Sequence, residues 1–166
     1  LFASAQRNAA PIQTLVQLYG RASIVQKELG VTGAELINFT DKVGLALRVA
    51  GTDAQSASGA LLQLSQALGA GTVRAEEFNS ILEGALPIAQ AAAAGLTEAG
   101  GSVAKLRQLV VDGKVSSEAF FRAFEAGSAT LQGKVANSVK TIDQEFTGFQ
   151  NTLIDTARDF NKNAQA

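Results

Sequence analysis

Acidic side chains are the groups in this sequence best suited to catalysis. Glu76 and Glu77 are adjacent, Glu83 follows them, and Asp143 and Glu145 lie near the C-terminal end. Two carboxyl groups that face each other across a cleft can act as general acid and base, as in glycosidases. Neighbouring residues of a helix do not face each other, so Glu76 and Glu77 are a poor pair. They fit better in the first turn of a helix, where carboxylates complement the helix dipole.

A glycine-containing turn is the second candidate for chemistry. The segment QLSQALGAGTVRAEEFNSIL (63–82) places Gly69 and Gly71 just before a helical pattern, and glycines at that position can hold a phosphate. A phosphate loop also needs a preceding strand, and a Lys-Ser/Thr pair or a third spaced glycine after it. The segment has neither. It therefore predicts a bend between two helices, with a glycine in the left-handed conformation.

Several reactive residue types are missing. The sequence has no cysteine, histidine, methionine or tryptophan, which excludes disulfides, thiolate and imidazole zinc sites, and catalysis by cysteine or histidine. Its 14 basic and 15 acidic residues are scattered and give a net charge of −1, which argues against nucleic-acid binding. We expect no enzyme activity, cofactor, metal site or nucleic-acid partner. A hydrolase with paired carboxylates remains an alternative.

Two long uncharged runs raise the question of a membrane. Residues 54–73 contain several glutamines, serines and glycines, and the more apolar run 84–97 is short and contains Pro87. Neither run provides the roughly 18 to 20 apolar residues of a membrane span, so we expect no stable span. A membrane-active, toxin-like helical domain is a further alternative. Since the chain starts at Leu1 and lacks methionine, we expect a fragment of a longer protein.

The apolar residues recur with helical spacing. Alanine, leucine, glutamine and glutamate are abundant, prolines are few, and alternating strand patterns are nearly absent, which indicates an all-α chain. Three stripes are Leu15, Leu18, Tyr19, Ala22, Val25 and Leu29, then Leu36, Phe39, Val43 and Leu47, then Ala57, Leu61, Leu64 and Leu68. Each stripe predicts a helix that buries one face in a bundle. The alanine-rich run 89–96 predicts a thin helix that packs closely against a neighbour.

The joints between these helices carry capping signals. GVTGAEL (30–36) predicts a capping box from Thr32 and Glu35. GKVSSEAF (113–120) has the same arrangement of a valine, a serine cap and a later phenylalanine. GTVRAEEF (71–78) repeats the valine and phenylalanine spacing, although an arginine stands at the cap position. The chain therefore predicts several short, separately capped helices.

Longer helices are expected at the two ends. Val135, Val139, Ile142, Phe146, Phe149, Leu153, Ala157 and Phe160 follow a heptad seam with one stutter. They predict a helix over 138–163, about 40 Å long. The N-terminal helix is expected over 11–29, where Pro11 begins or kinks it. We thus expect an all-α, multi-helix bundle in one domain (1–166), with a compact middle at 30–133 flanked by long N- and C-terminal helices.

The stretch GALLQLSQALGAGTVRAEEFNSILEGALPIAQ (59–90) resembles the tape-measure domain in tail-length proteins of long-tailed bacteriophages and prophages. The matching features are the Q-L-S-Q-A helix end, the glycine turn, the G-T-V-R-A-E-E-F-N helix start, and then I-L-E and I-A-Q-A. The resemblance covers roughly residues 15–125 well and the terminal helices more loosely. Ala75 departs from a second glycine that the family often has. This departure should only make the turn less flexible.

The resemblance implies a structural module that acts in tail assembly and tail-length determination. It implies contacts with tail-tube, tail-tip or tail-assembly chaperone proteins, self-association through the terminal helices, and a place inside the virion tail tube after assembly in the host cytoplasm. We expect protein contacts on the exposed sides of helices 74–83 and 116–125. In the second of these, Phe121 points about 100° away from the core-facing side chains. The candidate contact residues are Arg74, Glu77, Asn79, Phe121 and Arg122.

Overall fold

The computed structural model describes residues 2–51, 53–131 and 142–164, and every regular element in this part of the chain is a helix. The helices are α1 (Phe2–Ile24), α2 (Gln26–Leu29), α3 (Gly33–Ala50), α4 (Ala54–Gly69), α5 (Ala75–Gly84), α6 (Leu86–Gly95), α7 (Val103–Val111), α8 (Ser117–Gly127) and α10 (Ile142–Ala164). The all-α, multi-helix fold class is therefore confirmed, and the two terminal helices, with 23 residues each, are the longest of these helices.

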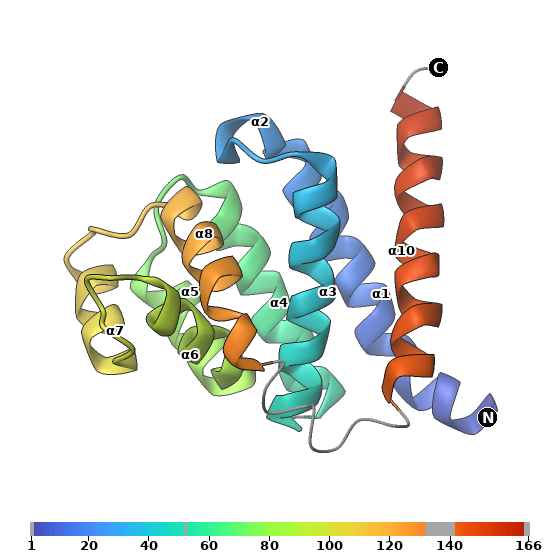
Figure 1. The fold of residues 1–166 in the computed structure, drawn as a ribbon, viewed down its shortest axis with the longest axis horizontal. Coiled ribbons are helices and arrows are strands. Elements are labelled where there is room, and N and C mark those ends of the chain that lie inside the picture. Colours follow the sequence, from blue (N-terminus) through green and yellow to red (C-terminus); the bar gives the residue numbers. More distant parts are fainter. Residues whose placement is uncertain (1, 52, 132–141, 165–166) are drawn as a thin grey trace.

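The helices form a bundle with the long helices at one end (Figure 1). α10 lies beside α1, and α1 also packs against α3 and α4. The short helices α5 to α8 form the other end, with α7 farthest from α10. α6 and α8 are the most extensively packed pair, and α6 also contacts α3, α5 and α7. Because neighbours surround α6, its apolar residues from Pro87 to Ala93 are buried.

Local hydrogen bonds explain where the helices begin. At α3 the Thr32 hydroxyl accepts from the Glu35 N–H at 3.1 Å, and the Glu35 carboxylate accepts from the Thr32 N–H at 2.8 Å. The predicted capping box is thus confirmed. The hydroxyl of Ser116 caps α8 by accepting from a backbone N–H at 3.0 Å. At α5, where Arg74 has no side-chain acceptor, the Glu77 carboxylate accepts from the Arg74 N–H at 3.2 Å.

The predicted apolar stripes form one core. All their members are buried except Val25, which is partly buried against that core. Aromatic contacts join distant parts of the chain within it. Phe39 of α3 stacks on Phe121 at a centroid distance of 4.3 Å and meets the edge of Phe124 at 5.1 Å. Phe78 and Phe120, from the starts of α5 and α8, meet edge to face at 6.5 Å. Such pairs add to the free energy of apolar burial.

Small residues allow two very close helix contacts. A Cβ atom on Gly95 of α6 would overlap the carbonyl oxygen of Ala123 in α8, and one on Gly127 would overlap that of Ala91. The prediction that the alanine-rich run packs tightly against a neighbour is therefore confirmed. A similar contact joins α5 to α4, where a Cβ on Gly84 would lie 2.6 Å from the Ser56 carbonyl oxygen.

The terminal helices differ in detail from their prediction. α1 begins at Phe2 instead of near residue 11 and continues through Pro11, and a break at Val25 separates it from α2. Of the predicted C-terminal seam, Val135 and Val139 lie outside the described residues. The side chains of the three seam residues from 142 to 149 are also outside the described part. Farther along α10, Leu153 and Ala157 are buried, whereas Phe160 is 48 % exposed.

Candidate protein-contact surface

The five residues predicted to make protein contacts lie in different environments. Arg74 is exposed at the start of α5, and Asn79 is half-buried. Glu77 is buried and serves the N-terminus of its own helix. Phe121 is fully buried, so the expectation that it lies on an exposed side of α8 is wrong. It points away from Phe120, as predicted, but α3 covers that side of α8 and supplies Phe39 to stack on it.

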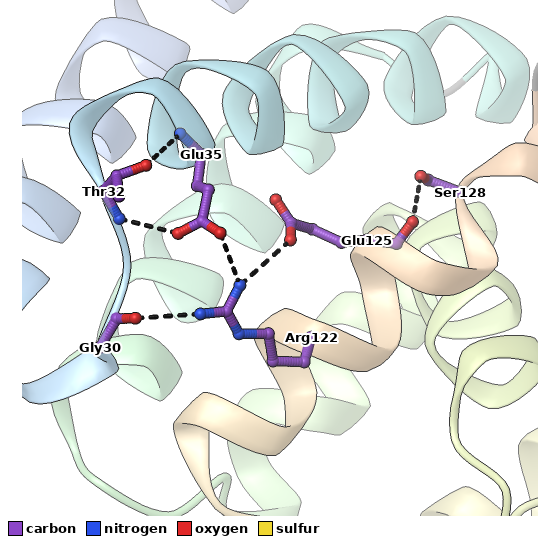
Figure 2. A network of polar contacts seen from close by, with 6 residues as sticks. All are labelled: Gly30, Thr32, Glu35, Arg122, Glu125 and Ser128. Carbon is purple, nitrogen blue, oxygen red and sulfur yellow. Dashed lines mark hydrogen bonds and ion pairs between the residues drawn. The ribbon is translucent and has the colours of Figure 1, made fainter.

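Arg122 lies at the centre of a network that joins α8 to the α2–α3 joint (Figure 2). One terminal guanidinium nitrogen donates to Glu35 Oε1 at 3.0 Å, and the second terminal nitrogen donates to the Gly30 carbonyl oxygen at 2.9 Å. Glu125 of α8 lies 3.7 Å from the first of these nitrogens. The side chains of Arg122 and Glu35 remain 41 % and 37 % exposed. Arg122 thus joins two parts of the fold, although part of its side chain stays accessible to solvent.

The two carboxyl groups of this network have pKa values shifted in opposite directions. Hydrogen bonding from the Thr32 backbone N–H, followed by that from Arg122, lowers the pKa of Glu35 below its usual range. Burial raises the pKa of Glu125, although Lys42 and Arg122 oppose that effect. The pKa of Arg122 is raised, chiefly by its hydrogen bond with Glu35. The Glu35–Arg122 pair is therefore ionised throughout the neutral range.

The joints before α5 and α8 pair with each other. The Val73 N–H donates to the Val115 carbonyl at 3.0 Å, the Ser117 N–H donates to the Gly71 carbonyl at 3.0 Å, and Thr72 and Ser116 form an antiparallel bridge. Gly71 has φ of +83°, which confirms the predicted bend with a left-handed glycine. The recurring G-x-V segments therefore meet in space and bring the starts of both candidate helices together.

This paired joint leaves a mixed-charge surface accessible. Arg74 and Glu76 of the α5 end are exposed, as are Lys114 and Glu118 of the α8 end. Farther along α5, Asn79 Oδ1 accepts from Arg107 Nε of α7 at 3.2 Å. The two segments predicted to contact partners thus begin side by side, and polar groups of both signs surround their junction.

Among the described acids considered for catalysis, Glu76, Glu77 and Glu83, none forms an acid–base pair. Glu76 is exposed and Glu77 is buried, as expected for neighbours on a helix, and Glu83 is exposed. The side chains of Asp143 and Glu145 lie outside the described part of the structure.

Among the described residues, no group of three or more acidic side chains has a metal-binding arrangement. None of the helices described is both long and apolar enough to span a membrane.

A comparison with protein-family models identifies the family of this chain. A family model described as "Tape measure protein" covers residues 1–162, which is nearly the whole chain. The chain belongs to the tape measure protein family. Membership of this structural family gives it a role in the phage tail, where its partners are other tail components. No curated protein and no solved structure matched the chain.

Sequence reasoning missed two features of this tape measure chain. The sequence pattern indicates Glu35 only as a helix cap, whereas in the fold its second carboxylate oxygen binds Arg122. A capping glutamate followed by a distant arginine carries no sequence signal, because 87 residues separate the pair. The paired joints did leave a signal, since the G-x-V pattern occurs near residues 71 and 113. The contact between these segments became visible only in the fold.

Proposed function

We propose that this chain is a compact module of a longer tape measure protein and acts in tail assembly and tail-length determination through protein contacts. The family match over residues 1–162 is the observation that carries the proposal. We place the module inside the tail tube of the virion, and in the host cytoplasm during assembly. Tail-tube, tail-tip or tail-assembly chaperone proteins are its proposed partners, together with self-association through the terminal helices.

The fold supports a compact module better than a stretched ruler segment. A single helix of 166 residues would be about 250 Å long, whereas a globular chain of this size has a radius of gyration near 15 Å. α1 and α10 lie side by side and run in the same direction (Figure 1), so the start of α1 and the end of α10 lie at opposite ends of this pair. Each has 23 residues and is about 35 Å long. The folded module would thus add about one helix length.

The test is an in-frame deletion of these residues in the parent gene, with tail lengths measured in electron micrographs. A compact module predicts tails shortened by at most about 35 Å, or failed assembly if its contacts are required. A deletion of equal size in a segment that is one continuous helix is the control, and should shorten tails by about 250 Å. If deleting the module also shortens tails by about 250 Å, the segment is extended and the compact proposal is wrong.

A further inference from the structure

An open groove runs between α1 and α4 and takes no part in the contacts described above. Its volume is about 430 Å³, and its lining comes from one side of each helix. Leu18 of α1 and Leu61 of α4 line it and are buried, whereas the neighbouring Leu62 is 41 % exposed. The groove therefore has an apolar floor and an accessible apolar side chain on its rim.

Polar contacts cross this groove at two levels. The hydroxyls of Thr14 and Ser58 lie 3.0 Å apart, and Arg21 donates to the Ser65 hydroxyl at 3.4 Å. The first contact precedes Leu18 and Leu61 along the two helices and the second follows them, so α1 and α4 are held together at both ends of the groove. The groove is thus already formed in the isolated chain, which lowers the ordering cost of binding.

Gly59 lies in the interior of α4 and lines the groove. Glycine inside a helix is destabilising relative to alanine, so its presence needs a reason. Neighbouring helices supply the reason at Gly84, Gly95 and Gly127, where a Cβ atom would collide. At Gly59 a Cβ would meet no atom of the described residues within 4 Å. Packing among the described residues therefore gives no reason for the glycine, whereas close approach by a helix of another molecule does.

The charges around the groove indicate the chemistry of that helix. No charged residue occurs from Ala54 to Val73, so the whole exposed face of α4 lacks charge, as the centres of protein interfaces commonly do. Arg21 is the charged residue among the described residues of the lining. We propose that the groove binds an amphipathic helix of a partner protein, with its apolar stripe on Leu62 and Gly59 and a carboxylate facing Arg21. A second copy of this lining would bring another arginine and no carboxylate.

Two synthetic helical peptides test this proposal with the purified 166-residue chain. Both carry one leucine stripe, flanked by glutamates in the first and by lysines in the second, and fluorescence anisotropy measures their dissociation constants. The glutamate peptide should bind about fivefold more tightly, as expected for an exposed ion pair. Arg21→Glu should reverse this order. If both peptides bind equally to both proteins, or neither binds, the proposal is wrong.

Substitutions on α4 separate binding from folding. Gly59→Gln should weaken binding of the glutamate peptide at least about tenfold. The same change should raise Tm by about 2–4 °C, because it removes a helix glycine. Leu62→Asp should also weaken binding, whereas Leu86→Asp should not, because Leu86 is 44 % exposed on α6 outside the groove. If Leu62→Asp and Leu86→Asp weaken binding of the glutamate peptide equally, the proposal is overturned. A dimer of the chain that Leu62→Asp dissociates would assign the groove to a second copy instead.

Discussion

Arg122 connects parts of the molecule that lie far apart in the sequence. Its guanidinium binds the carbonyl oxygen of Gly30 and the carboxylate of Glu35, and lies 6.0 Å from the ring centroid of Phe121. An ion pair as exposed as this one adds little to the free energy of folding. The position of this pair matters more than its energy, because the same Glu35 caps α3 and Gly30 ends α2. Arg122 therefore positions the joint between these helices relative to α8.

The opposite pKa shifts predict opposite effects of pH on stability. The lowered pKa of Glu35 stabilises the fold above the ordinary value of 4.5, and this contribution is lost as pH falls through the lowered pKa. The Tm advantage of the native chain over Glu35→Gln should thus shrink on acidification from pH 7 to 3. Glu125 has a raised pKa, so ionising it opposes folding as pH rises above 4.5. Glu125→Gln should therefore gain Tm relative to the native chain as pH rises. If the Tm of each variant changes with pH in parallel with the Tm of the native chain, the two pKa shifts do not act on stability as proposed.

At the scale of helices, the contact between α6 and α8 depends on residues without side chains. Gly95 and Gly127 each face the backbone of the opposite helix, with Ala91 and Ala123 beside them. This arrangement brings the two backbones close enough for many dispersion contacts, which are individually weak and together substantial. Any added side-chain atom must push the helices apart, since the carbonyl groups cannot yield.

Adding a single methyl group at this contact should destabilise the fold. Gly95→Ala or Gly127→Ala should lower the free energy of unfolding by about 1–3 kcal/mol, as overpacking does, despite the higher helix propensity of alanine. Gly59→Ala is the matched control, because a Cβ there would meet no atom of the described residues, and it should raise the free energy of unfolding by about 0.5–1 kcal/mol. Urea titrations of the three variants measure these changes. A gain in stability at Gly95 would show that the two helices are not in close contact.

The whole molecule consists of a well-packed body and a terminal helix, α10, whose described side chains are mostly exposed. Among the α10 side chains described, from 151 to 162, Leu153 and Ala157 are the buried ones. By contrast, α8 buries three phenylalanines, and α6 is enclosed by its neighbours. Stability is therefore concentrated in the body formed by α1 to α8, to which residues 151–162 of α10 add two buried side chains.

A chain shortened to end at Leu131 should therefore still fold. Loss of the Leu153 contact should cost about 1.5–3 kcal/mol, and unfolding should remain cooperative in circular dichroism. A chain ending at Ser116 is the control. It lacks α8 with Phe120, Phe121 and Phe124 and should not fold, because each lost aromatic costs about 3–5 kcal/mol. If the chain ending at Leu131 is unfolded as well, α10 contributes more to the core than its buried side chains indicate.

Much of the fold could be predicted because its signals are local. The cap at Thr32 and Glu35 joins residues three positions apart, and a stripe such as Leu36, Phe39 and Val43 repeats within one helix. The bend at Gly71 likewise depends on the conformational freedom of one residue. The candidate site was less predictable. Whether Phe121 is exposed depends on α3, which lies some 80 residues earlier in the sequence.

The sequence by itself determined the helix class, the caps, the bend and the apolar faces, since these follow from interactions within one or two turns. It also carried the motifs by which the family is recognised. The tertiary structure alone decided how many sides of each helix are covered: α8 has neighbours on more than one side, so Phe121 is buried and Arg122 is bound to the α2–α3 joint. It also determined that a groove forms between α1 and α4. Periodicity shows one apolar face of a helix, whereas only packing shows what covers the others.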